Sequence, residues 1–142
     1  MSRIKIAFVE TESGIPVVKC RIRSVKEPIY VVLDSGAELT TIDSRLGKGL
    51  VHEGDAFTCS VNGLISRKEA VFTKVKCSIA TEGVDGSTVI LHVEAYASEL
   101  PELNLRLSNG DKVKISAILG CDILTSLDSK IDFVKKIWSI SL

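Results

Sequence analysis

Apolar and polar residues alternate over several short stretches of this chain, which is the pattern of half-buried β-strands. The alternation covers residues 4–8 and, after a turn at Ser13-Gly14, residues 17–22, so these two stretches are expected to be antiparallel strands. Further strands are expected at 40–42, 71–79, 87–96, 113–119, 130–133 and 137–142. Ser44 is expected to cap a short turn after the first of these, and no long helical pattern appears in residues 1–50. The pattern therefore predicts an all-β fold.

The chain is organised around residues 29–33, a continuous apolar run that ends at Asp34-Ser35-Gly36-Ala37. Such a run predicts a buried strand that holds Asp34 at its end, where Gly36 lets the backbone bend and pack closely. Ser35 can support the neighbouring loop through its hydroxyl, which both donates and accepts hydrogen bonds. Asp-Ser-Gly is also an ordinary turn sequence, so this motif alone does not identify a site.

A second apolar run, residues 115–124, contains Ile118-Leu119-Gly120-Cys121-Asp122. Gly120 is expected to permit close packing beside the Asp34 turn. Asp122 is expected to be the N-cap of a short helix over residues 123–127, because Asp is among the favoured N-caps. A role for Asp122 as a second catalytic carboxylate is the less favoured alternative. The two runs together are far more specific than either one.

Asn62-Gly63 is the strongest hairpin signal in the chain, because both positions of the turn tolerate a positive φ. Residues 56–61 and 64–72 are expected to be its strands. Residues 97–112, with Pro101 and the polar run Ser108-Asn109-Gly110-Asp111, fit the strand pattern poorly. That segment is a substrate-side loop, an extra hairpin or a linker, and the sequence leaves the choice open.

Length and composition indicate one domain over residues 1–142 and exclude several functional classes. Eighteen basic and 18 acidic residues give a net charge of zero without a basic cluster, so no nucleic-acid partner is expected. Four cysteines lack a C-x-x-C pair and the two histidines lie 40 positions apart, so we expect buried reduced thiols in a cytoplasmic protein and no metal site. No apolar run approaches the roughly 18 residues of a membrane span, so no membrane partner is expected.

The motif Leu-Asp-Ser-Gly-Ala at 33–37, followed by Thr41-Ile42 and by Ile-Leu-Gly-x-Asp-x-Leu at 118–124, resembles the retroviral and retrotransposon aspartic proteases. Residues 38–43 resemble most the corresponding segment of retrotransposon enzymes of the BEL/Pao kind. The resemblance implies a retropepsin-like closed β-barrel with a flap hairpin and one short C-terminal helix, one half of an aspartic protease dimer. It implies no cofactor and no metal. The residues that it implies are, for catalysis, Asp34, Ser35 and Gly36, and for substrate binding Ala37, Glu38, Asn62, Gly63, Leu64 and Ile118.

The chain departs from the compact viral enzymes at two places. Those enzymes often carry an arginine after the glycine of the second motif, and Cys121 stands there in this chain. A thiol cannot form an ion pair with Glu38, so the support of the loop is expected to differ. Compared with the viral enzymes, residues 97–112 look like an insertion. By the same resemblance, the hairpin around Asn62-Gly63 is the flap that closes over the substrate, and the alternative is an ordinary surface hairpin.

One Asp-Ser-Gly per chain implies that the second catalytic carboxylate comes from a second copy, in a two-fold homodimer. The nearest similar triplet, Asp85-Gly86-Ser87, has the wrong order. In viral relatives the terminal strands of the two subunits interleave, which would involve residues 4–8 and 137–142 here. The alternative is that both strands pair within one subunit.

The predicted function is an aspartic endopeptidase that hydrolyses peptide bonds in the polyprotein that contains it, in the cytoplasm or within a virus-like particle. Two facing Asp34 carboxylates would share one proton and activate a water, which gives a bell-shaped pH–rate profile on the acid side of neutrality. The alternative is a non-proteolytic peptide-binding or dimerisation module with the same fold. A serine hydrolase that uses Ser35 has little support, because G-x-S-x-G is absent around it.

Overall fold

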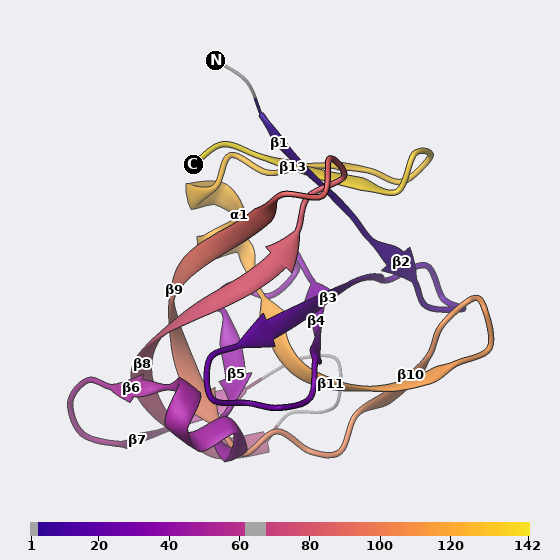
Figure 1. The fold of residues 1–142 in the computed structure, drawn as a ribbon. Helices are drawn as coiled ribbons and strands as arrows, with labels where there is room; N and C mark the ends of the chain where they lie inside the picture. Colours follow the sequence, from indigo (N-terminus) through magenta and orange to yellow (C-terminus); the bar gives the residue numbers. More distant parts are fainter. Residues whose placement is uncertain (1–2, 62–67) are drawn as a thin grey trace.

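A computed structural model describes residues 3–61 and 68–142 of the chain (Figure 1). Most of the regular structure in these ranges is β-strand, as the alternation predicts. In chain order the elements are β1 (Ile4–Ala7), β2 (Val9–Glu10), β3 (Pro16–Ile22), β4 (Ile29–Leu33), β5 (Thr41–Asp43), the 3-10 helix η1 (Ser44–Gly49), β6 (Val51–His52), β7 (Phe57–Val61), β8 (Lys68–Glu82), β9 (Thr88–Ser98), β10 (Asn104–Arg106), β11 (Lys112–Leu119), α1 (Cys121–Ser126), β12 (Lys130–Asp132) and β13 (Ile137–Ile140).

A ring of β-strands closes into a barrel in the described part of the chain. Hydrogen-bonded neighbours follow the order β3-β4-β11-β5-β9-β8, and β8 returns to β3 through the pairs Arg21↔Ala80 and Ile22↔Ile79. The β4–β11 and β5–β9 pairs are parallel and the other pairs of the ring are antiparallel. Closure leaves the ring without long open edges. The predicted all-β closed barrel is confirmed.

The barrel interior is filled by the inward-facing residues of these strands. Val31 and Leu33 of β4 are at most 3% exposed and belong to the same buried cluster as Ala117 and Leu119 of β11. Full burial of one such aliphatic side chain contributes about 1.5–3 kcal/mol. The unbroken apolar run that leads to Asp34 is therefore a strand with both faces covered, as its sequence predicts.

A second, smaller sheet with the order β1-β13-β12 closes one end of the barrel, beside both chain termini (Figure 1). Its residues Ile6, Trp138 and Ile140 are at most 1% exposed and belong to the same buried cluster as the barrel interior. Arg3 fastens β1 to the C-terminal part of the chain, because its Nε donates to Ser139 Oγ at 2.7 Å and its Nη1 to Asp128 Oδ2 at 2.8 Å.

The terminal strands pair within one chain, so the expectation that they interleave with a partner is wrong for this arrangement. β1 pairs with β13 from Ile4↔Ile140 to Ala7↔Ile137, and β12 occupies the other edge of β13. Both edges of β13 are thus already filled by its own chain. The expected pairing of residues 4–8 with 17–22 is also wrong, because β3 is paired there by the short strand β2, with Val9 opposite Val17.

The hairpin predicted around Asn62-Gly63 exists as the β7–β8 pair, but its register differs from the prediction. Asn62, Gly63 and Leu64 themselves lie outside the described residues. A two-residue turn at 62–63 would place Val61 opposite Leu64, whereas the described strands place Val61 opposite Lys68. The same register continues from Val61 opposite Lys68 to Phe57 opposite Phe72. These cross-strand pairs therefore set the register of the hairpin.

The segment 97–112 forms an extra hairpin, one of the three alternatives that the sequence left open. β9 ends at Ser98, and β10 then pairs with β11 in antiparallel fashion, with Leu105 opposite Val113 (Figure 1). In the turn between them Gly110 has a φ of +94°, a conformation that side chains rarely adopt. The hairpin lies on the outer face of the barrel, over a second apolar cluster.

Asp43, and not Ser44 as expected, caps the helix η1 that follows β5. The Asp43 carboxylate accepts the Arg45 N–H at 3.1 Å and also pairs with the Arg45 side chain, whose Nε and Nη2 lie 2.9 and 2.8 Å from its oxygens. The Asp43 partner raises the pKa of the Arg45 guanidinium. Both Ser and Asp are favoured caps, and the ion pair available to the carboxylate favours Asp here.

The prediction of buried thiols is confirmed for Cys20 and Cys77 and wrong for Cys121, which is exposed at the start of α1. The Cys59 side chain lies outside the described residues. Burial raises the pKa of the Cys20 thiol to about 12 and that of Cys77 to about 11, so both stay protonated at neutral pH.

Candidate active site

Asp34 lies at the end of β4, in a tight turn that its own carboxylate helps to form. The Asp34 N–H donates to Leu119 O at 2.9 Å, which extends the β4–β11 pairing by one bond. Asp34 Oδ1 accepts the Gly36 N–H at 2.9 Å, and Asp34 O accepts the Ala37 N–H at 3.1 Å. Asp34 is half-buried, while Ser35 and Gly36 are exposed. The carboxylate is therefore held in place and still accessible from solvent.

Gly36 is required by the carboxylate that precedes it in this turn. A Cβ at this position would lie 3.1 Å from Asp34 Oδ1, which is tighter than ordinary contacts, so a larger residue would push on the carboxylate. The sequence predicted a close approach of Gly36 to other backbone, and the close neighbour is instead the Asp34 side chain.

Gly120 brings the second motif against the loop that follows the Asp34 turn, as predicted. A Cβ on Gly120 would lie 2.6 Å from Leu39 O and 2.8 Å from Ala37 O, distances that no side chain tolerates. The first N–H groups of α1 then bond to the loop: Cys121 N–H donates to Ala37 O at 2.6 Å and Asp122 N–H to Glu38 O at 3.2 Å. Helix-terminal N–H groups, which lack partners within a helix, thus hold the loop.

The sequence predicted that Asp122 is the N-cap of the helix, and this is wrong. Asp122 instead accepts hydrogen bonds from Thr40. The helix begins at Cys121 with Gly120 as its N-cap and no side-chain cap. Asp122 Oδ1 accepts from the Thr40 hydroxyl at 2.7 Å and Oδ2 from the Thr40 N–H at 3.1 Å. The Thr40 hydroxyl in turn accepts the Gly120 N–H at 3.0 Å, and Thr40 is 1% exposed. This partly buried network supports the loop, and none of the ion pairs in the described ranges involves Glu38.

The predicted substrate-binding residues fall into two groups. Ala37 and Glu38 follow the turn directly, Ala37 half-buried and Glu38 exposed, and Ile118 lies between Val32 and Thr41 in the sheet beside it. The structure therefore brings these three together around the Asp34 turn. The other three, at 62–64, lie outside the described residues.

The described chain supplies one carboxylate at this turn. Neither an ion pair nor a hydrogen bond from another described carboxyl group reaches Asp34. Asp85, in the triplet of reversed order, lies in the β8–β9 turn, where the Ser87 hydroxyl donates to it at 2.6 Å and lowers its pKa. Asp85 is thus committed to its own turn.

A serine hydrolase site is not assembled around Ser35 in the described ranges. His92 Nδ1 bonds to Ser78 Oγ at 2.9 Å, and none of the hydrogen bonds in these ranges joins a histidine to Ser35. Among the described side chains, no group of three or more His, Cys, Asp or Glu could hold a metal ion. The described helices include none that is long and apolar enough to cross a bilayer.

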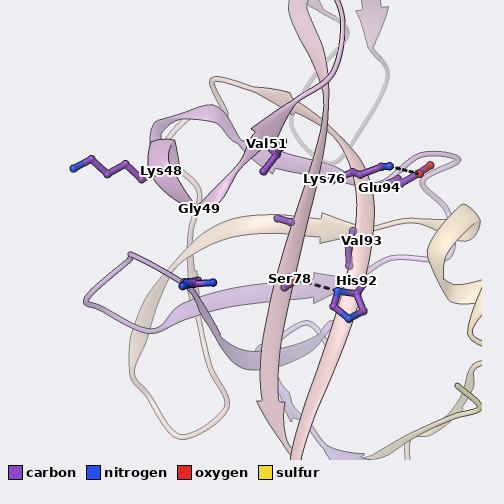
Figure 2. Close-up of a pocket in the computed structure, with 10 residues that line it drawn as sticks. Lys48, Gly49, Val51, Lys76, Ser78, His92, Val93 and Glu94 are labelled. Atoms are coloured by element: carbon purple, nitrogen blue, oxygen red, sulfur yellow. Dashed lines mark hydrogen bonds and ion pairs between the residues drawn. The ribbon is translucent and has the colours of Figure 1, made fainter.

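A separate cavity of about 520 Å³ lies where η1 and β6 meet the β8–β9 pair (Figure 2). Its lining contains none of the residues of the Asp34 turn. The polar groups there pair across the strands, Ser78 with His92 at 2.9 Å and Lys76 with Glu94 at 3.8 Å, and Lys48 points away from them. Ser78, His92, Lys76 and Glu94 are thus engaged in pairs with one another across the strands.

The chain matches no protein-family model and no curated protein by sequence. Its fold is similar to that of a retropepsin-like aspartic protease from Rickettsia conorii, with a TM-score of 0.52 and 15% identity over 98% of this chain and 91% of that one. A retroviral protease-like domain of Ddi1 from Leishmania major aligns with a TM-score of 0.46 and 16% identity over 95% of this chain and 89% of that one. On its closed barrel and its likeness to the Rickettsia structure, this chain has the retropepsin-like fold.

Proposed function

We propose that the chain is an aspartic endopeptidase, active as a two-fold homodimer in which each copy supplies one Asp34. The observation that carries the proposal is the Asp34 turn itself. Its carboxylate is fixed by the Gly36 N–H, anchored through Leu119, and half-exposed on a rigid strand end. A catalytic carboxylate needs this combination of fixed geometry and access.

In the proposed dimer the two Asp34 carboxylates face each other across the two-fold axis and share one proton, as like charges at short range cannot both ionise easily. The ionised carboxylate takes a proton from a bound water, which attacks the peptide carbonyl carbon. The protonated one donates to the carbonyl oxygen, which gives a tetrahedral intermediate with two hydroxyl groups. The intermediate collapses when the first carboxyl gives the proton taken from water to the amine nitrogen, the C–N bond breaks, and the second carboxylate takes a proton from one of the hydroxyl groups. No covalent enzyme intermediate forms, and each carboxylate ends one turnover ready for the next.

The substrate of the proposed enzyme lies extended across the turn and is held by backbone hydrogen bonds, as an added strand would be. We place Ala37, Glu38 and Ile118 beside it, and the hairpin connection at Asn62, Gly63 and Leu64 above it as the flap. The proposed natural substrate is a polyprotein of a retrotransposon of the BEL/Pao kind, because the motif at 33–43 is most similar to those enzymes.

The decisive experiment compares the wild-type chain with Asp34→Asn and Ser35→Ala in cleavage of a peptide mixture at mildly acid pH. Asp34→Asn keeps the hydrogen bond to the Gly36 N–H through its side-chain oxygen and removes the acid–base group, so cleavage should fall at least about 100-fold. Ser35→Ala should only weaken cleavage, and pepstatin should inhibit the wild type. Sedimentation across a concentration series should show that active samples contain dimer. Full activity of Asp34→Asn would refute the assignment.

A second candidate is a non-proteolytic module, an alternative that the sequence left as peptide-binding or dimerising, and one observation favours its peptide-binding form. The terminal strands pair within one chain, so the chain completes its terminal sheet without a partner. A chain that stays monomeric and inactive at every concentration, yet binds peptides, would support this candidate over the enzyme.

A further inference from the structure

The cavity of about 520 Å³ beside η1 gathers positive charge from three separate segments of the chain (Figure 2). Arg23 follows β3, Lys48 belongs to η1 and Lys76 belongs to β8, whereas Glu94 is the single acidic residue among the described residues of the lining. Over the whole chain, acidic and basic residues balance at 18 each. The excess of cations at this cavity is therefore a local feature that the fold creates.

Two of these cations have no partner within the described part of the chain. None of the hydrogen bonds and ion pairs there involves the side chain of Arg23 or Lys48. Lys76, by contrast, lies 3.5 Å from Glu53 Oε2 and 3.8 Å from Glu94 Oε1, so its charge is largely offset. Arg23 and Lys48 thus supply positive charge that an anion at this place would neutralise.

The wall that carries Lys48 is fixed against the wall that carries Arg23. A Cβ on Gly49 would collide with the Ile22 side chain and would lie 3.1 Å from Arg23 O, so only glycine allows η1 to pack this closely on the end of β3. The next residue, Leu50, is 6% exposed and belongs to the core cluster, which anchors the segment. The two unpaired cations therefore stand on adjoining, preformed walls, as a binding site requires.

The floor of the cavity adds a neutral hydrogen-bond donor. Ser78 of β8 lies directly opposite His92 of β9, with 2.9 Å between Ser78 Oγ and His92 Nδ1 (Figure 2). When the Ser78 hydroxyl donates to Nδ1, the other ring nitrogen, Nε2, carries the hydrogen. Both side chains are exposed, and none of the hydrogen bonds in the described ranges uses Nε2. This N–H is thus available to a ligand.

We propose that this cavity binds a small organic molecule that carries a phosphate monoester, with Arg23 and Lys48 as its main partners and His92 as a donor from the floor. A phosphate monoester carries a charge of about −1.5 to −2 at pH 7, which matches two unpaired cations. The planar guanidinium of Arg23 can hold two phosphate oxygens at once. Lys48 points away from the floor, and its flexible four-carbon side chain lets the ammonium turn toward an anion (Figure 2).

The size of the cavity decides that the ligand is larger than phosphate alone. Its volume of about 520 Å³ lies within the range of roughly 300–1,000 Å³ that small-molecule sites occupy. A single phosphate group fills only a small part of such a space, so the proposed ligand has an organic group beside it. None of the residues of the Asp34 turn lines the cavity, so the inference does not depend on the proposed peptidase function.

The test is an NMR titration of the 15N-labelled chain at about 0.15 M salt, with adenosine 5′-monophosphate as the probe and adenosine as the same molecule without phosphate. The monophosphate should shift the amide signals of the lining residues and bind at least about 10-fold more tightly than adenosine. Arg23→Ala and Lys48→Ala should each raise its Kd about 5- to 10-fold, because each removes a charge-assisted hydrogen bond. Glu94→Gln should lower the Kd about 2- to 5-fold, because it removes the carboxylate that repels the phosphate.

Lys74→Ala is the matched control, because it removes the same charge from the same face of β8 at an exposed residue that does not line the cavity. It should change the Kd less than about 2-fold, since salt screens charges beyond roughly 8 Å. The substituted side chains are all exposed, and thermal unfolding shows that each variant is folded. Asp34→Asn should bind like the wild type.

The inference is overturned if the monophosphate does not bind, if adenosine binds as tightly, or if Arg23→Ala and Lys48→Ala have no larger effect than Lys74→Ala. Inorganic phosphate should shift the same signals with a weaker affinity, and affinity equal to that of the monophosphate would overturn the need for an organic group. A site that disappears in Asp34→Asn would also overturn the inference, because the binding would then belong to the Asp34 turn. Each of these outcomes is independent of whether the chain cleaves peptides.

Discussion

Asp122→Ala should destabilise the chain strongly, although Asp122 lies outside the proposed catalytic pair. The substitution removes the acceptor of two hydrogen bonds from Thr40, one from its hydroxyl at 2.7 Å and one from its N–H at 3.1 Å. Thr40 is 1% exposed, so water does not replace the carboxylate. The Ile123 N–H, which lies 2.8 Å from Asp122 Oδ1, loses its acceptor as well.

The magnitude follows from the donors that are left without partners. A buried donor that loses its acceptor costs about 1–3 kcal/mol, and bonds to a charged acceptor are at the upper end. The Thr40 hydroxyl can rotate and still accepts the Gly120 N–H at 3.0 Å, which preserves part of the network. We therefore expect a loss of about 2–4 kcal/mol in the free energy of unfolding. Asp122→Asn keeps one oxygen acceptor and should cost about half of that.

Urea unfolding measures this loss, with the fluorescence of Trp138 as the probe, since it is the single tryptophan of the chain. Thr40→Val and the double variant complete a mutant cycle, whose coupling energy should be about 1–3 kcal/mol. Asp128→Asn is the control: its carboxylate pairs with Arg3 but is 73% exposed, and Asn tolerates the φ of +47° at this position, so loss of the charge should cost under about 1 kcal/mol. A cost of less than about 0.5 kcal/mol for Asp122→Ala, with no coupling to Thr40, would refute the reasoning.

Three further predictions concern the same scaffold. Gly120→Ala should destabilise the chain by about 1–3 kcal/mol in urea unfolding, because its Cβ would meet the backbone at Leu39 O; unchanged stability would contradict the close contact. Burial raises the pKa of Cys20 and Cys77 above the value of 9.0 expected when unfolded, so stability should be intact below pH 9 and fall as pH rises from there toward 11–12; Cys20→Ala with Cys77→Ala should flatten that fall. Trp138→Ala should cost about 3–5 kcal/mol in thermal unfolding, as the side chain is 1% exposed in the core.

The parts of the fold that follow from contiguous sequence could be predicted. The apolar run before Asp34 and the glycine after Leu119 each specify a buried strand that ends at a close contact, and the structure joins them through the Asp34 N–H and Leu119 O. The alternation at 71–79 and 87–96 likewise predicts the long β8–β9 pair. In both cases the order of apolar and polar residues indicates which faces of a strand are buried.

The contacts between distant polar residues could not be predicted. Thr40 and Asp122 are 82 positions apart, and the local preference of Asp for a helix N-cap points to a different partner. Only the close approach at Gly120 brings the Thr40 donors within reach of the carboxylate. The pairing of β1 with β13 could not be predicted either, because two amphipathic terminal strands can pair equally well within one chain or between two.

The Asp34 turn is held by hydrogen bonds that do not require the proposed dimer. Hydrogen bonds within the described chain fix the turn: Asp34 with Leu119, Gly36 with Asp34, and α1 with the loop at Ala37 and Glu38. These contacts hold the carboxylate in position, and the proposed dimer would then have to bring two such turns together. Since both edges of β13 are occupied, the terminal sheet can add a partner only at the outer edges of β1 or β12. The affinity of the proposed dimer, and not the folding of the turn, would then set the concentration at which activity appears.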